Sequence, residues 1–267
     1  MFNKTLLKSN IKSNYAILIV IAGVIFMYTS IMIGMYDPAT SEKMNQLMEL
    51  FPKEVIGAFG FKLESGSLLE FLTSYLYGFI FLIFPLIVEM VVAHRVIARH
   101  VDKGSMAYIL STPNDRKRIA LTQMFFLEVC VFLITVYISL ILIICSAIAF
   151  PGLLDIWKLL YVNVGLFLLH SALSGICFFA SCIANESKTS LSIGVGVSVT
   201  FYVIQMLANT GDKLEFLKYA TIFTLYQPSE ILAKNNNTIW NYSIMALIAI
   251  TAYGIGIYQF SRRDLPL

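Results

Sequence analysis

The residues of this chain best placed to do chemistry are His170 and the nearby serines Ser171 and Ser174. A histidine beside hydroxyl groups suggests a nucleophilic site, because imidazole can accept the proton of an attacking serine. However, the sequence places no acidic residue beside this group, and no His, Asp or Glu stands three or four residues from His170 to share a metal ion. We therefore expect no catalytic residue, metal site or proton relay, and interpret His170 as a hydrogen-bonding contact between helices.

Two carboxylates also lie in apolar surroundings, where a charged side chain is costly and usually faces protein or water. Glu89 is close to a basic segment, so it either reaches the headgroup region or pairs with Arg95 or with the basic residues near Arg116. Glu128 lies deeper in its apolar run. We predict that Glu128 makes a polar contact in a transport path or between helices.

The sequence contains no phosphate-binding loop of the form Gly-x-x-x-x-Gly-Lys-Ser/Thr. Any ATP hydrolysis would have to occur in another protein, so we expect this chain to bind no cofactor itself. The four cysteines show no Cys-x-x-Cys spacing and all fall in apolar runs; they are Cys130, Cys145, Cys177 and Cys182. We interpret them as buried apolar side chains rather than as disulfide or metal ligands.

These residues are embedded in six apolar runs, each long enough to cross a membrane. A bilayer core about 30 Å thick requires roughly 20 apolar helical residues. Hydrophobic residues make up 58% of the 267-residue chain and charged residues 13%, with a mean hydropathy of +0.78. The predicted fold is an all-α membrane protein, one transmembrane domain (1–267) with spans at about 15–36, 69–92, 119–150, 156–184, 190–207 and 239–260.

The distribution of positive charge predicts the orientation. Twelve of the 19 Lys and Arg residues fall on the side that contains both termini and the segment 93–118, and seven fall on the other side. Because basic residues accumulate in cytoplasmic loops, both termini are predicted to be cytoplasmic. The net charge of +3 reflects this asymmetry, so the sequence indicates membrane lipid as a partner and no nucleic acid.

Three segments outside the spans have helical patterns of their own. In residues 1–14, Leu6 and Ile11 fall on one side of a helix and the lysines on the other, which predicts an interfacial helix; a basic tail that only fixes topology is the alternative. The two outward segments, 37–68 and 208–238, are also amphipathic. They form either a simple cap over the bundle or a gate at the outer leaflet.

The inward segment 93–118 has the pattern of a short capped helix. Gly104 breaks the preceding helix, Ser105 can cap the next one, and Pro113 ends it about two turns later. Apolar side chains share one face of this helix at i, i+3 and i+4, namely Met106, Ile109 and Leu110. We predict that this face is exposed and inserts into a groove on a partner. The alternative is a basic anchor that only sets topology.

Several stretches together resemble a known family. In the inward segment they are Gly104-Ser105, Thr112-Pro113 and the basic cluster Arg116-Lys117-Arg118. Elsewhere they are Leu50-Phe51-Pro52 with Ala58-Phe59-Gly60, and the ending Phe260-Ser261-Arg262-Arg263-Asp264-Leu265. In these features and in its layout the chain resembles the permeases of ABC-2 type transporters. One departure is that Arg99, His100 and Asp102 stand where the family often has an acidic pair before the glycine.

The resemblance implies a transmembrane subunit that assembles with a second permease, identical or homologous, and with two copies of an ABC ATPase. ATP and Mg²⁺ would be bound by the ATPase. The segment Ala107–Thr112 would be the coupling helix, docked in the ATPase beside the N-terminal helix. The residues implied in ATPase coupling are Gly104, Ser105, Met106, Ile109, Leu110, Pro113 and Arg116.

The fifth span carries small residues at every fourth position in two rows. One row is Ser190, Gly194 and Ser198, and the other is Ser192, Gly196 and Thr200. Small side chains let helix backbones approach closely in lipid. The rows predict packing within one bundle or at the seam between two permeases. We favour the seam, because the fifth span lies near it in the related family.

The function we predict is that of a permease subunit of an ATP-driven ABC exporter in a bacterial cytoplasmic membrane, with an amphipathic or lipophilic substrate such as a peptide, drug or lipid-like molecule. A secondary transporter would show an internal repeat with charges near the membrane midplane, and the sequence shows neither. A membrane-embedded enzyme would need a fuller set of catalytic residues. A non-transporting sensor or assembly subunit is the remaining alternative.

Overall fold

The computed structural model describes residues 3–36, 50, 52–58, 67–111, 115–233 and 237–263. Within them, six helices are long and apolar enough to cross a membrane, which confirms the six predicted spans. They are α1 (Lys4–Met35), the stretch Leu68–Asp102, α8 (Arg116–Ala149), α9 (Ile156–Ile183), α10 (Ser187–Ala208) and α12 (Asn237–Arg262). The described residues contain no strand, so the predicted all-α fold is confirmed.

The second span is assembled from four helical segments rather than one. It consists of α4 (Leu68–Leu72), a π-helix η1 (Thr73–Ile80), α5 (Phe81–Val96) and α6 (Ala98–Asp102). A reciprocal capping box starts it, in which the Ser67 side chain accepts from the Glu70 N–H and Glu70 accepts from the Ser67 N–H. Pro85 lies inside α5. A π-helix and an internal proline both interrupt the regular hydrogen-bond ladder, so this span is the least regular of the six.

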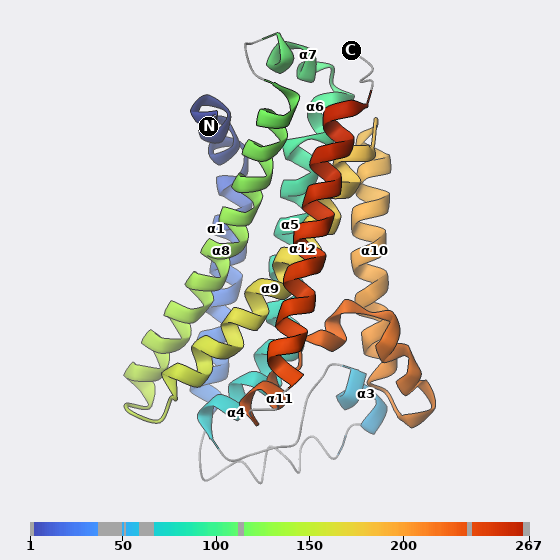
Figure 1. The fold of residues 1–267 in the computed structure, drawn as a ribbon. Coiled ribbons are helices and arrows are strands. Elements are labelled where there is room, and N and C mark those ends of the chain that lie inside the picture. The colour runs from blue at the N-terminus through green and yellow to red at the C-terminus, as the bar shows by residue number, and fades with distance from the viewer. Residues whose placement is uncertain are drawn as a thin grey trace.

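Short helices mark the two ends of the bundle. Figure 1 shows α7 (Ser105–Leu110) at the end where the chain begins and where α12 finishes. The opposite end carries α3 (Lys53–Ala58), two 3-10 helices, η2 (Asp212–Ala220) and η3 (Ile222–Leu225), and α11 (Pro228–Leu232). The inward segment and both ends of the described chain therefore share one side, as the charge distribution predicts.

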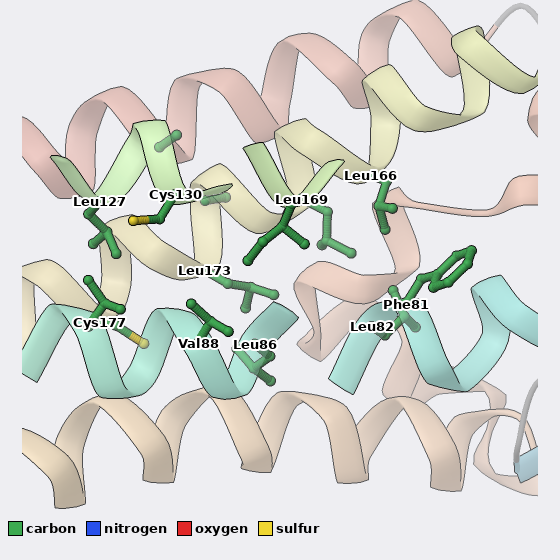
Figure 2. Packing of buried hydrophobic residues seen from close by; sticks show 14 of the residues in the cluster. Phe81, Leu82, Leu86, Val88, Leu127, Cys130, Leu166, Leu169, Leu173 and Cys177 are labelled. Carbon is green, nitrogen blue, oxygen red and sulfur yellow. The ribbon is translucent and has the colours of Figure 1, made fainter. Parts of the chain in front are cut away.

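Helix α9 is the centre of the bundle. It packs against α5, α8, α10 and α12, and 72% of its most apolar window is buried, against 22% for α1 and for α10. Figure 2 shows part of the resulting core, in which Leu169 and Leu173 of α9 lie between Leu127 of α8 and Val88 of α5. Cys130 and Cys177 are free thiols within this apolar core, which confirms their interpretation as packing residues.

Glycines bring α9 and α12 into close contact. A β carbon on Gly165 would lie 2.6 Å from the Tyr242 hydroxyl, and one on Gly256 would lie 3.1 Å from the ring of Phe178. Such distances leave room for a hydrogen atom and for little else. Close backbone approach of this kind increases van der Waals contact, which drives helix association where lipid already surrounds apolar side chains.

The N-terminal residues are continuous with the helix of the first span, and their predicted interfacial position stays a prediction. Helix α1 is continuous from Lys4, and Figure 1 shows its first turns inclined to the remainder. Its protein-facing row is Leu6, Asn10 and Asn14, whereas Ile11, which the sequence placed on the same side as Leu6, is 58% exposed. The Asn10 amide donates to Gln123 Oε1 of α8. Polar contacts to protein therefore position this segment.

Candidate functional site

The inward hairpin is a tight connection between α6 and α7. Gly104 adopts a left-handed conformation with φ = 65°, which glycine adopts without the steric cost that a β carbon imposes. Ser105 is the first residue of α7 and not its cap, since Gly104 occupies the cap position. The Ser105 hydroxyl instead contacts His100 Nδ1 at 2.9 Å across the hairpin. The predicted glycine break is thus confirmed, and the predicted capping role of Ser105 is wrong.

The apolar face of α7 lies against the bundle rather than outside it. Met106 is fully buried, and Ile109 and Leu110 are half-buried and pack against the same core. The predicted exposure of this face is therefore wrong for Met106, whereas a contact of Ile109 and Leu110 with a partner stays a prediction. The side chain that projects from α7 is Tyr108, which is 81% exposed. Sequence reasoning missed Tyr108, although its position between Met106 and Ile109 places it on the opposite face.

The hairpin is held to the bundle at several points. The α6 backbone N–H of Ala98 donates to Ser181 Oγ of α9 at 3.0 Å, and Ser187 Oγ at the start of α10 donates to Asp102 Oδ2 at 2.6 Å. Arg116, at the start of α8, donates to the carbonyl of Arg263 at 2.6 Å. These bonds join the helices on either side of the hairpin. Pro113 lies outside the described residues.

Arg263 fastens the end of α12 to the end of α9. Its guanidinium donates to the backbone carbonyls of Cys182 and Ala184 at 2.6 and 2.9 Å, and to Asn185 Oδ1 at 2.9 Å. The last carbonyls of a helix have no partner within it, so an arginine there satisfies acceptors that would otherwise be unpaired. Hydrogen bonds therefore join the start of α8 to the ends of α9 and α12 on the inward side of the bundle.

A buried ion pair lies inside the bundle. His170 Nδ1 is 2.6 Å from Glu89 Oε1, and both side chains are only 1% exposed. The pairing of Glu89 with Arg95 or with the basic cluster, and its extension to the headgroups, are thus wrong; Arg95 instead donates to Ser13 O and Asn14 Oδ1. The two residues are far apart in sequence and on different helices, so no spacing rule could have paired them.

Pro85 leaves one backbone carbonyl of α5 without its helical donor, and His170 bonds to that carbonyl. Proline has no N–H, so the carbonyl four residues earlier, that of Phe81, loses its donor within α5. His170 Nε2 lies 2.8 Å from this carbonyl oxygen and donates to it. The expectation of a helix-to-helix hydrogen bond is confirmed. Nε2 is therefore the ring nitrogen that carries a proton, and Nδ1 faces the Glu89 carboxyl group.

Glu128 belongs to the same polar cluster. Its Oε2 accepts from Ser171 Oγ at 3.0 Å, and the Tyr253 hydroxyl of α12 lies near its carboxyl group. Ser174 Oγ lies 2.7 Å from the Tyr253 hydroxyl. The prediction of a polar contact between helices is confirmed for Glu128. The contacts of Tyr253 were not foreseen, because tyrosine in an apolar run is usually an ordinary core residue.

This geometry does not support a nucleophilic site. Both ring nitrogens of His170 are engaged, one by the Phe81 carbonyl and one by Glu89, so neither is available to take a proton from a serine. Ser171 donates to Glu128 instead. Among the residues that the structure describes, no three His, Cys, Asp or Glu side chains could together hold a metal ion. The cluster joins α5, α8, α9 and α12 in the interior of the bundle.

The two small-residue rows of α10 differ in their surroundings. In the first row, a β carbon on Gly194 would lie 3.5 Å from Cys177 Cα, and Ser198 Oγ is 3.6 Å from Cys177 Sγ. This row packs on α9 within the chain, so its assignment to a seam between permeases is wrong. In the second row, a β carbon on Gly196 would have no described atom within 4 Å other than those of its own helix. Ser192, Gly196 and Thr200 face outward.

The six spans and the interior polar cluster define a multi-pass membrane protein. A family model described as ABC-2 family transporter protein matches residues 7–265, so the chain belongs to this family. It is accordingly a membrane component of an ABC transporter, generally non-catalytic in this family, and membership implies association with ABC ATPase partners. Comparison with curated proteins finds no match.

Proposed function

We propose that this chain is the permease subunit of an ATP-driven exporter, assembled with a second permease, identical or homologous, and with two copies of an ABC ATPase. The family match over residues 7–265 is the observation that carries the proposal. ATP and Mg²⁺ bind to the ATPase subunits. The excess of Lys and Arg at the end that bears α7 supports a cytoplasmic position for that end, in a bacterial cytoplasmic membrane.

The ATPase contact is centred on the exposed side of α7. Tyr108 projects from the helix, and Asp102 and Lys103 are exposed beside it. An exposed aromatic side chain next to charges is the composition that protein interfaces favour at their anchor points. Met106 packs in the core and anchors α7 to the bundle. Movement of the ATPase at Tyr108 would therefore be transmitted to the helices that the hairpin connects.

Co-purification with a co-expressed ABC ATPase tests this contact. Tyr108→Asp is expected to lower the yield of ATPase at least fivefold, because a charge replaces the projecting ring at the interface. Tyr219→Asp is the matched control, since Tyr219 is 94% exposed on a short helix at the opposite end of the bundle. Equal, full recovery of ATPase with both variants would contradict the contact.

The second permease packs against the outward row of α10. The row of Ser192, Gly196 and Thr200 offers a flat surface for close helix approach, and the described chain leaves it uncovered. If the partner is identical, Gly196→Cys should form a disulfide-linked dimer under mild oxidation in membranes. Gly254→Cys on α12 is the control, because Gly254 is equally uncrowded. Cross-linking of the control alone would place the seam elsewhere.

The cargo is amphipathic or lipophilic, such as a peptide, drug or lipid-like molecule. The apolar, aromatic lining of the spans and the internal pairing of Glu89 with His170 support this class. Uptake of a fluorescent amphiphile into inside-out vesicles, dependent on ATP and on the ATPase, tests the direction. Accumulation only in right-side-out vesicles would show import instead.

A further inference from the structure

A cavity at the end of the bundle opposite α7 is unrelated to the hairpin and to the buried ion pair. It measures about 170 Å³ and lies between the π-helix η1 with α5, the last turns of α10, and the segment that runs from η2 to α11. A cavity of about 150 Å³ holds a benzene ring. The space therefore fits one ring-sized group, and its rim residues Lys218 and Gln227 are half-buried.

One wall of the cavity consists of amide side chains held in fixed orientations. Gln205 Nε2 lies 3.0 Å from Asn209 Oδ1, and Gln205 Oε1 lies 2.9 Å from Thr224 Oγ1, whose hydrogen is donated to the Lys218 carbonyl. Gln227 Nε2 donates to the Thr224 carbonyl at 3.3 Å. These contacts engage one end of the Asn209 amide and leave the other end as a hydrogen-bonding group on the wall. Hydrogen-bonding groups that are fixed before a ligand arrives lower the entropy lost on binding.

The Tyr202 side chain lines the same wall, and its hydroxyl is buried away from the cavity surface. Its side chain is 8% exposed, and its hydroxyl has no hydrogen-bond partner among the described residues. The ring is fixed by an edge-to-face contact with Phe223, with centroids 5.4 Å apart. Tyr202 therefore contributes its ring, and not its hydroxyl, to the cavity wall.

The other walls are aromatic. Tyr77 donates its hydroxyl to Asn163 Oδ1 at 2.7 Å, and the Tyr226 hydroxyl donates to the Val162 carbonyl at 3.4 Å. Both hydroxyls are thus used by α9, so these tyrosines contribute their rings to the cavity rather than a polar group. Flat aromatic walls favour a planar or ring-shaped group, through stacked or edge-to-face contacts.

Among the described residues that line the cavity, there is no uncompensated charge. Lys218 is its charged residue, and Lys218 Nζ is 3.0 Å from Glu215 Oε1. An ionic ligand would lose hydration without gaining a free counter-charge. We propose that the cavity is a binding site for an uncharged molecule that has one ring and a hydrogen-bonding group, which the amides of Gln205 and Asn209 recognise. That exported cargo occupies this site during transport rests on the proposed function, whereas the binding of an uncharged ring compound does not.

Three probes of equal size and different charge test the site: benzyl alcohol, benzylamine and benzoate. Each is titrated into the purified protein in detergent and followed by saturation-transfer NMR, with protein-free micelles as the blank. Benzyl alcohol is expected to bind saturably and the two ionic probes at least tenfold more weakly. Asn209→Leu, which removes the amide and keeps a side chain of similar size, is expected to weaken benzyl alcohol binding about fivefold.

A blocked cavity provides the decisive comparison. Ala58 of α3 lines the cavity, so Ala58→Phe should abolish saturable binding. Val55→Phe on the same helix is the matched control, because Val55 is exposed and does not line the cavity. Identical binding by both variants, or equal binding of all three probes, would overturn the proposal. Loss of the ATPase contact with intact probe binding would refute the proposed function and leave this site standing.

Discussion

His170→Leu is expected to destabilise the bundle strongly, because it leaves two buried polar groups without partners. Glu89, 1% exposed, would lose the imidazole 2.6 Å away, and the Phe81 carbonyl would lose the donor that replaces Pro85. Removing one member of a buried pair costs about 3–5 kcal/mol, and an unsatisfied carbonyl adds about 1–3 kcal/mol. A loss of about 4–8 kcal/mol corresponds to a Tm lower by roughly 8–30 °C.

The chain carries its own reporter for this measurement. Cys130, Cys177 and Cys182 are free and buried. A thiol-reactive fluorogenic dye will therefore label them as the detergent-solubilised protein unfolds on heating. The midpoint of the fluorescence rise gives the Tm of each variant.

Two second-site changes separate the contributions. Glu89→Leu in the His170→Leu background removes the unpaired carboxyl group, so most of the 3–5 kcal/mol loss should be recovered, to within about 1–3 kcal/mol of the native protein. Adding Pro85→Ala restores an N–H four residues after Phe81, which should recover the remainder. If the double variant is no more stable than His170→Leu, or if Pro85→Ala gives no gain, the reasoning about this pair is refuted.

Two further predictions use matched glycines. Gly165→Leu should lower the Tm by several degrees, since its side chain would collide with Tyr242, whereas Gly254→Leu, with no described neighbour, should change the Tm by less than the error of the same dye assay. Gly104→Ala and Gly152→Ala both place a β carbon at positive φ and should each cost about 1–2 kcal/mol. Only Gly104→Ala, which tilts α7, should also reduce ATPase co-purification; an equal reduction for both would contradict the role of α7.

The spans and the hairpin could be predicted from the sequence because each depends on a local property. Twenty apolar residues without charge are long enough to cross a bilayer wherever they occur, so length and hydropathy were sufficient. Gly104 is recognisable because a glycine that interrupts helical periodicity commonly marks the end of a helix. The family resemblance rested on these same local patterns, and residues 7–265 match the family as expected.

The surroundings of individual side chains could not be predicted in the same way. The i, i+3, i+4 pattern shows that Met106, Ile109 and Leu110 share a face, but burial against the chain itself and burial against a partner give the same pattern. The pairing of Glu89 with His170 depends on the relative rotation and height of two helices, and these are set by packing. The first small-residue row of α10 was misassigned for the same reason.

The irregular second span has a mechanical consequence. An α-helix resists bending because each carbonyl accepts a hydrogen bond from the N–H four residues later. In this span the hydrogen-bond pattern changes along the π-helix η1, and the bond to the Phe81 carbonyl is missing because residue 85 is proline. The same span carries α7 at one end and Tyr77 and Gly78 of the cavity wall at the other. We expect the parts of the span on either side of Phe81 to bend relative to each other. The hydrogen bond from His170 to the Phe81 carbonyl restrains this bending, and breaking it would allow the span to bend.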